Sequence, residues 1–161
     1  MMSIPLLLSV IAMAAGPNQQ PGSQALSTPN DQAAAVLAPI KAMMAGIEKR
    51  DSEMILAQVR PEDSATAVVE HSDGTTTVKR SDWATYLAVI KSGPERYQAT
   101  LGQAAVQIDG NIAMVWVPYS FEIDGRVIHC GVDHFDLVRE HSEWKVLNET
   151  WSQRTKGCSA K

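Results

Sequence analysis

The sequence is short of positive charge. It contains 14 Lys and Arg against 18 Asp and Glu, which gives a formal net charge of −4 at pH 7. No basic cluster is longer than a pair such as Lys79-Arg80. Proteins that bind nucleic acid usually present a basic stripe, so the composition argues against nucleic acid as a partner.

The common catalytic and metal motifs are also missing. The sequence has no G-x-S-x-G elbow, no C-x-x-C pair, no Gly-rich phosphate loop and no H-E-x-x-H pattern. None of its four histidines lies in a sequence pattern that indicates a catalytic role. We therefore expect no cofactor, and no motif commits the protein to one chemistry.

The chain has no hydrophobic run long enough to cross a bilayer, which takes about 20 apolar residues. Its one long run, residues 4–15, ends in an A-x-A-like cleavage signal, so residues 1–15 are predicted to be a signal peptide. The usual basic segment before the run is missing, and a buried helix or a misplaced start codon is the alternative. No cysteine follows the run to carry a lipid, so we expect a periplasmic or secreted protein without stable membrane insertion.

Residues 16–30 are rich in Pro, Gln, Ser and Gly and are predicted to be a flexible linker. The domain itself is predicted over residues 31–155, with a tail at residues 156–161. Only two cysteines are present, Cys130 and Cys158. An exported protein favours a disulfide between them, which closes a loop of about 28 residues. The alternative is two unpaired thiols.

Three helices are predicted before the main sheet. The first begins at Asn30 or Asp31, because apolar residues then recur at three- and four-residue spacing up to Ile47. A second, shorter helix follows with Ser52 as its cap. A third begins at Ser81 or Asp82, after a hairpin formed by residues 66–71 and 75–79 around Asp73-Gly74.

Long segments with a period of two follow: residues 97–108, 112–123, 127–138 and 144–151. Very short turns join them, so one contiguous antiparallel meander is predicted. Four strands of this length twist and curl, and the helices must cover one face to bury their apolar stripes. The predicted fold class is α+β, with three N-terminal helices packed on a strongly curved antiparallel sheet as a cone-like α+β barrel.

Four segments, in order, carry a resemblance to a known superfamily: residues 46–51 (GIEKRD), 60–65 (RPEDSA), 108–115 (IDGNIAMV), and 135–139 (FDLVR) followed by 143–146 (EWKV). Over residues 31–155 the chain resembles the nuclear transport factor 2-like superfamily, in its SnoaL-like and lumazine-binding-like bacterial branches. The resemblance implies a cone with an internal pocket, frequently in a homodimer. It implies little about activity, because the superfamily includes isomerases, dehydratases, cyclases and binding modules.

Residues 129–134 (HCGVDH) form the densest group of metal-binding residue types. On a helix, Cys130, Asp133 and His134 would converge. On the strand that we predict, Cys130 and His134 share a face but lie about 13 Å apart. No metal site is therefore predicted.

The pocket gives the best candidate site. We assign Phe135, Leu137, Trp144 and Val146 to the concave face, and Val115, Val117, Tyr119 and Phe121 are expected to share it. By alternation, the polar residues on this face are Tyr119, Asp133, Asn148 and Thr150. Trp83 and Tyr86 are expected at the mouth, although their spacing also suits a core position for Trp83.

A carboxyl group in such a pocket acquires a raised pKa and can act as a base, which makes Asp133 the candidate catalytic residue. Alternatively, Asp133 accepts hydrogen bonds from neighbouring strands and Tyr119 is a core residue with its hydroxyl at the rim.

Three functional hypotheses follow. The first is an exported ligand-binding or accessory domain that holds a small apolar molecule. The second is a SnoaL-like or ketosteroid-isomerase-like enzyme, with Asp133 as general base and Tyr119 polarising a carbonyl. The third is a protein-interaction module that uses the convex face at Met114, Trp116 and Val132. Apolar residues on both faces of residues 112–123 favour a homodimer.

Overall fold

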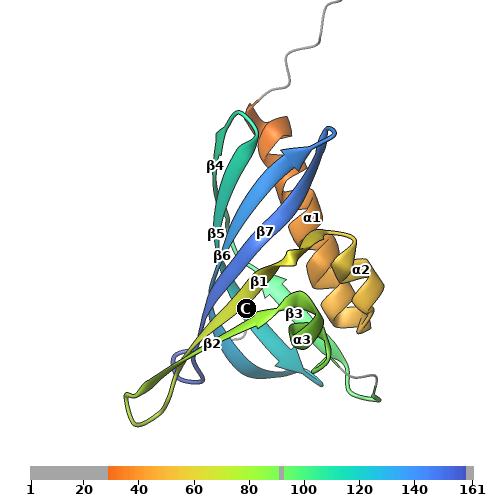
Figure 1. Ribbon diagram of the computed structural model, residues 1–161. Helices are drawn as coiled ribbons and strands as arrows, with labels where there is room; N and C mark the ends of the chain where they lie inside the picture. Colours follow the sequence, from red (N-terminus) through yellow and green to blue (C-terminus); the bar gives the residue numbers. More distant parts are fainter. Residues whose placement is uncertain (1–28, 91–92, 159–161) are drawn as a thin grey trace, which may run out of the picture.

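The computed structural model describes residues 29–90 and 93–158, which form three helices and a seven-stranded sheet (Figure 1). The predicted signal peptide and residues 16–28 of the predicted linker lie outside the described residues. The first helix begins at Pro29, so the last two residues of the predicted linker belong to it.

Helix α1 (Pro29–Lys49) is the long helix of the fold, and α2 (Ser52–Leu56) and α3 (Trp83–Leu87) are single short turns. The Asp51 carboxylate accepts the amide N–H groups of Glu53 and Met54, so Asp51 and not Ser52 caps α2. Asp82 caps α3, as predicted. No helix within the described residues is long and apolar enough to span a membrane.

The strands are β1 (Val59–Glu70), β2 (Thr76–Asp82), β3 (Tyr97–Leu101), β4 (Ala105–Asp109), β5 (Ile112–Ile123), β6 (Arg126–Glu140) and β7 (Glu143–Gln153). Their order in the sheet is β2-β1-β7-β6-β5-β3, with β4 also paired to β5. The predicted hairpin is present as β1 and β2, and the turn at Asp124-Gly125 has the two positive φ angles of a tight hairpin.

The prediction of one antiparallel meander is wrong in two places. Strand β1 pairs with β7 in parallel, so the hairpin that precedes the meander extends the same sheet, which is mixed and does not close into a barrel. The strand predicted at residues 97–108 is divided into β3 and β4, which pair with opposite ends of β5. The break lies beside Pro118, whose carbonyl accepts the Gly102 N–H but which has no N–H to donate to the ladder.

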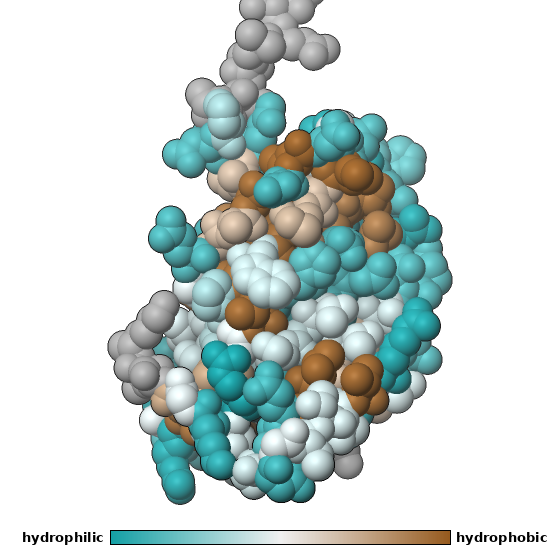
Figure 2. Space-filling model, turned by 90° about the vertical axis from the view of Figure 1, so that its left-hand side faces the viewer, coloured by the Kyte–Doolittle hydropathy of each residue, from teal (hydrophilic) through white to brown (hydrophobic). Residues whose placement is uncertain are grey.

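The core lies between the concave face of the sheet and the helices, which Figure 1 shows along one side of the sheet. The residues predicted to point inward do so: Phe135, Leu137, Trp144, Val146, Val115 and Val117 are all buried. On the opposite, convex face, Ile112, Met114 and Trp116 are exposed. Figure 2 views this side of the molecule and shows hydrophobic side chains gathered between hydrophilic ones.

The predicted disulfide is present between Cys130 and Cys158. It holds the segment after β7 against β6, where the backbones of Cys130 and Arg154 exchange two hydrogen bonds of 3.0 Å. Because side chains alternate along a strand, the disulfide lies on the outer face while His129 and Gly131 face inward.

Candidate functional site

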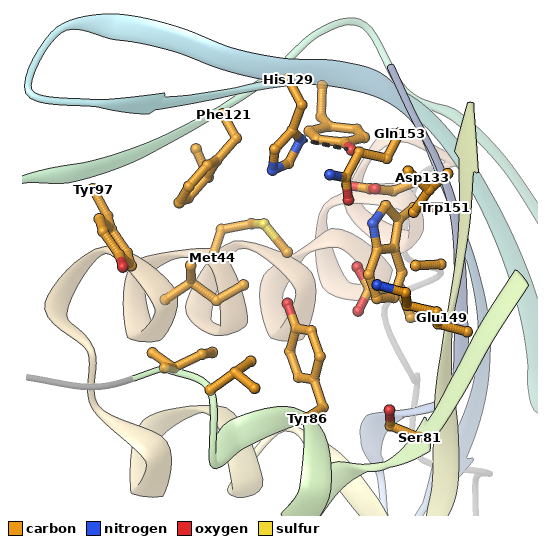
Figure 3. Close-up of a pocket in the computed structure, with 18 of the residues that line it drawn as sticks. Met44, Ser81, Tyr86, Tyr97, Phe121, His129, Asp133, Glu149, Trp151 and Gln153 are labelled. Atoms are coloured by element: carbon orange, nitrogen blue, oxygen red, sulfur yellow. Dashed lines mark hydrogen bonds between the residues drawn. The ribbon is translucent and has the colours of Figure 1, made fainter. Parts of the chain in front are cut away.

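A cavity of about 520 Å³ lies between the concave face of the sheet and helices α1 and α3. Apolar and aromatic side chains form most of its wall: Met44, Ile47, Ala67, Val69, Val89, Ile90, Tyr97, Ala99, Phe121 and Trp151. Figure 3 shows Tyr97 and Phe121 on one side of the cavity, with Asp133, Glu149 and Trp151 on the other. The cavity is therefore aromatic at one end and acidic at the other.

Two carboxyl groups form the acidic end. Asp133 on β6 and Glu149 on β7 are each 4% exposed. Asp133 is paired with Trp151 and Glu149 with Phe135, so the two acids are diagonal neighbours on the inward face of adjacent strands. Burial raises the pKa of Asp133 to about 8. Burial, and then the charge of Asp133, raise the pKa of Glu149 well above its usual value.

Neither carboxyl group has a hydrogen-bond donor or an ion-pair partner among the described side chains, and Glu149 Oε2 is fully buried without any partner. Buried polar atoms in proteins nearly always have a partner. The acidic pair therefore has hydrogen-bonding capacity that the described side chains do not use.

Tyr119 and His129 lie beside the acidic pair, and their side chains are hydrogen-bonded to each other. The Tyr119 hydroxyl lies 3.1 Å from His129 Nδ1 and 3.1 Å from the Ser152 carbonyl oxygen. Since the carbonyl can only accept, the hydroxyl donates to it and accepts from a protonated Nδ1, which leaves His129 Nε2 as an acceptor. Burial lowers the pKa of His129, so the ring is neutral at pH 7. Burial and the charges of the two acids raise the pKa of Tyr119.

A close approach of two strands makes this arrangement possible. Gly131 is the β6 residue paired with Tyr119, and a Cβ atom at Gly131 would lie 1.9 Å from the Ser152 carbonyl oxygen. Only glycine allows the Ser152 carbonyl to come so near β6 and accept the Tyr119 hydroxyl.

Tyr86 on α3 directs its hydroxyl into the cavity (Figure 3). Its ring meets Trp151 edge-on, with centroids 5.6 Å apart, and Trp83 at 5.9 Å. Trp83 is fully buried behind it and does not line the cavity. Burial, then the charges of Glu149 and Asp133, raise the pKa of the Tyr86 hydroxyl.

The structure brings together three of the predicted site residues, Tyr86, Tyr119 and Asp133. Asn148 and Thr150 do not line the cavity. Asn148 accepts a hydrogen bond of 3.3 Å from the Ser64 hydroxyl, and Thr150 is exposed. Glu149, which was not predicted, takes their place on the inward face.

A β-bulge explains the difference. Leu137 pairs with Val146, but Asp136 pairs with Asn148, so Leu147 is an extra residue in β7. One extra residue exchanges the two faces of the rest of the strand. The sequence carries a signal of this exchange, because the buried apolar positions are even-numbered up to Val146, whereas Trp151 is odd-numbered.

Among residues 29–90 and 93–158, no three His, Cys, Asp or Glu side chains are placed to hold a metal ion. The chemistry available at the acidic end of the cavity is that of the two acids, the phenols of Tyr86 and Tyr119 and the neutral imidazole of His129.

The fold is shared with several solved structures. A nuclear transport factor 2-like protein of unknown function from Shewanella baltica is 16% identical, with a TM-score of 0.62 over 81% of this chain and 99% of that one. The beta subunit of a "putative aromatic-ring-hydroxylating dioxygenase" from Novosphingobium aromaticivorans is 11% identical, with a TM-score of 0.62 over 78% and 91%. A "putative dehydratase" from Streptomyces avermitilis is 17% identical, with a TM-score of 0.58 over 80% and 99%.

These similarities confirm the nuclear transport factor 2-like superfamily for the fold. Residues 31–152 match the family described as "putative lumazine-binding", and the chain belongs to that family. None of the curated proteins matches the sequence.

The buried acids predict an unusual pH dependence of stability. The pKa of Asp133 is raised in the folded state, so between about pH 4 and pH 8 the unfolded chain loses this proton first and stability falls as pH rises, by about 1.4 kcal/mol per pH unit for one group. Asp133→Asn should remove the contribution of Asp133 to this slope and leave that of Glu149, so that stability is similar near pH 4 and higher by a few kcal/mol near pH 8. Urea unfolding of the wild type and the variant near pH 4 and pH 8 measures the free energy of unfolding.

The matched control is Asp136→Asn, the same change on the outer face of the same strand, where the side chain is 50% exposed. It should leave the slope unchanged. An equal slope in wild type and Asp133→Asn would show that Asp133 is not buried as described.

Proposed function

We propose that this protein is an exported ligand-binding or accessory domain that holds a small, mostly apolar molecule in the cavity, with a polar group of the ligand at Asp133 and Glu149. The observation that carries the proposal is a cavity with apolar walls that ends in two buried acids, of which Glu149 Oε2 has no partner. A volume of about 520 Å³ lies within the range of small-molecule sites. The family description, which names lumazine binding, supports the same class of function.

Export is part of the proposal. Disulfides persist in oxidising compartments and are rare in the cytosol, so the Cys130–Cys158 bridge supports a periplasmic or secreted location. The signal peptide predicted at residues 1–15 agrees with it.

The first test is a ligand screen with a blocked cavity as its control. Thermal unfolding of the protein is followed in the presence of small aromatic compounds, including lumazine and neutral and charged derivatives of indole and benzene. Ala99 lines the cavity, so Ala99→Phe should fill part of it and abolish the stabilisation that a bound compound gives. Ala105→Phe, at an exposed position of β4, should not.

Stabilisation that survives in Ala99→Phe would place the ligand elsewhere and contradict the proposal. So would the absence of any stabilising compound at millimolar concentration.

A second candidate function is an enzyme of the SnoaL-like or ketosteroid-isomerase-like kind, with Asp133 as general base. It requires Asp133 and Tyr119 on one cavity, and both line it. A base with a pKa of about 8 is matched to neutral conditions. The Tyr119 hydroxyl, however, is engaged by Ser152. Tyr86, whose hydroxyl points into the cavity, is the better candidate to polarise a carbonyl.

Proton exchange tests this second function without knowledge of the substrate. A small apolar ketone such as 1-indanone is incubated with the protein in D₂O, and the loss of its α-proton signal is followed by NMR. If Asp133 acts as a base, the protein accelerates the exchange and Asp133→Asn abolishes the acceleration, whereas Asp136→Asn retains it. Exchange at the rate of buffer alone would remove this candidate.

We further propose that the protein forms a homodimer through its convex face. Ile112, Met114 and Trp116 of β5 are exposed there, at 59%, 36% and 53%. Exposed apolar residues in one region mark interaction surfaces. The alternative is a partner protein on the same face, where the predicted contact Val132 is only half-buried.

Light scattering distinguishes a homodimer from a monomer that uses the convex face to bind a partner protein. A homodimer predicts twice the chain mass at micromolar concentration, and Trp116→Glu should convert it to a monomer without lowering the stability of the fold. A wild-type protein that stays monomeric would contradict the homodimer and leave the face to a partner protein.

A further inference from the structure

Among the described residues, no positively charged side chain is paired with the acidic end of the cavity. The polar groups that line the cavity near Asp133 and Glu149 are Tyr86 from α3, Tyr119 from β5, the neutral ring of His129 from β6 and the amide of Gln153 from β7 (Figure 3). Helix α1 contributes only Met44 and Ile47, and β3 contributes Tyr97 and Ala99.

Two basic side chains lie near this end of the molecule without pairing with the acids. Lys79 lines the cavity from the edge strand β2, where it is exposed. Arg154 lowers the pKa of Tyr119 by its charge but does not line the cavity. Neither forms an ion pair with Asp133 or Glu149 among the described residues. Within the described residues the acidic pair is thus left without a cationic partner, and a cationic ligand would supply one.

Hydrogen-bonding capacity points in the same direction. Ionised carboxyl groups only accept, and neither of these two accepts a hydrogen bond from a described side chain. An ammonium group offers up to three N–H donors together with a positive charge, so it can serve both acids at once. A ketone offers only acceptors. It can accept a hydrogen bond from one protonated acid, but it supplies no donor to the other carboxyl oxygens.

The rest of the wall suits the body of such a ligand. Phe121 meets Tyr97 edge-on with centroids 5.2 Å apart and stacks on His129 at 5.1 Å, which forms an aromatic surface opposite the acids (Figure 3). Tyr86 and Trp151 line the cavity near the acids, and aromatic rings attract cations. A molecule with a charged head and an apolar body matches both ends of the cavity.

We infer that the ligand is an organic amine that binds as a cation, with its ammonium group between Asp133 and Glu149 and its apolar or aromatic body against Phe121 and Tyr97. This inference rests on the proposed function and specifies the ligand class. A bound cation favours the ionised form of the acids, whose pKa values are raised by burial, so we expect binding to release protons.

The test compares amines with neutral molecules of the same shape. Tryptamine is compared with tryptophol, and 2-phenylethylamine with 2-phenylethanol, by calorimetric titration at pH 8.5 and pH 6.5. Each amine should bind at least about tenfold more tightly than its alcohol at pH 8.5. Its affinity should fall by about tenfold per pH unit as pH drops below 8, if one proton is displaced, while that of the alcohol should not fall. Titration in two buffers with different ionisation enthalpies counts the released protons.

Variants of the two acids test whether their negative charge causes the preference for the amine over the alcohol. Glu149→Gln and Asp133→Asn should each lose the preference for the amine and its pH dependence. Glu143→Gln and Asp136→Asn are the matched controls, because they make the same changes at exposed positions of the same strands. Both controls should keep the preference. Thermal unfolding establishes that each variant is folded before it is titrated.

Three results would overturn the inference. Alcohols that bind as tightly as amines would refute it and leave the proposed function standing. So would stabilising compounds in the screen that include no amine, or a preference for amines that persists in Glu149→Gln and Asp133→Asn. If no compound of the screen binds at all, the proposed function fails together with the inference.

Discussion

The pairing of β6 with β7 is the constraint on which the rest of the structure depends. It carries the bulge at Leu147, which turns Glu149 inward beside Asp133. It brings the Ser152 carbonyl against Gly131, where it receives the Tyr119 hydroxyl. On its other edge β7 holds β1 in parallel, which extends the sheet around the cavity. A shift of β7 by one residue in this pairing would turn Glu149 outward and away from Asp133.

The acidic pair is unfavourable for folding. Two neighbouring carboxyl groups in an apolar enclosure lose hydration and repel each other when both are ionised. The fold tolerates them because the apolar core is large and continuous on the helix side of the sheet, from Val36 on α1 to Phe135 on β6. Local features that oppose stability concentrate at functional sites, which agrees with a binding role for this end of the cavity.

Sequence signals that act over a few residues predicted turns, a helix start and the direction of side chains along a strand. Asp-Gly turns on both sides of β5 gave its bounds, the Asp82 cap gave the start of α3, and alternation gave the inward direction of Asp133. The errors arose from contacts between distant segments. Nothing near β1 specifies that it pairs with β7, and the bulge depends on how β7 lies against β6. For that reason Glu149 was missed and Asn148 and Thr150 were assigned to the wrong face, whereas Asp133 does line the cavity.

The disulfide lies on the outer face of β6, and the candidate site lies on the inner face of the same strand. Cys130 points outward between His129 and Gly131, and its bridge fixes the segment that follows Ser152. The end of the cavity that holds Tyr119 and His129 is thus rigid before any ligand arrives, and little of the binding free energy is lost in ordering it. The opposite end, formed by the short helix α3 and the edge strands, has no such restraint. For the ligand that we propose, the site of the polar head is therefore preorganised, whereas the shape of the apolar body can vary.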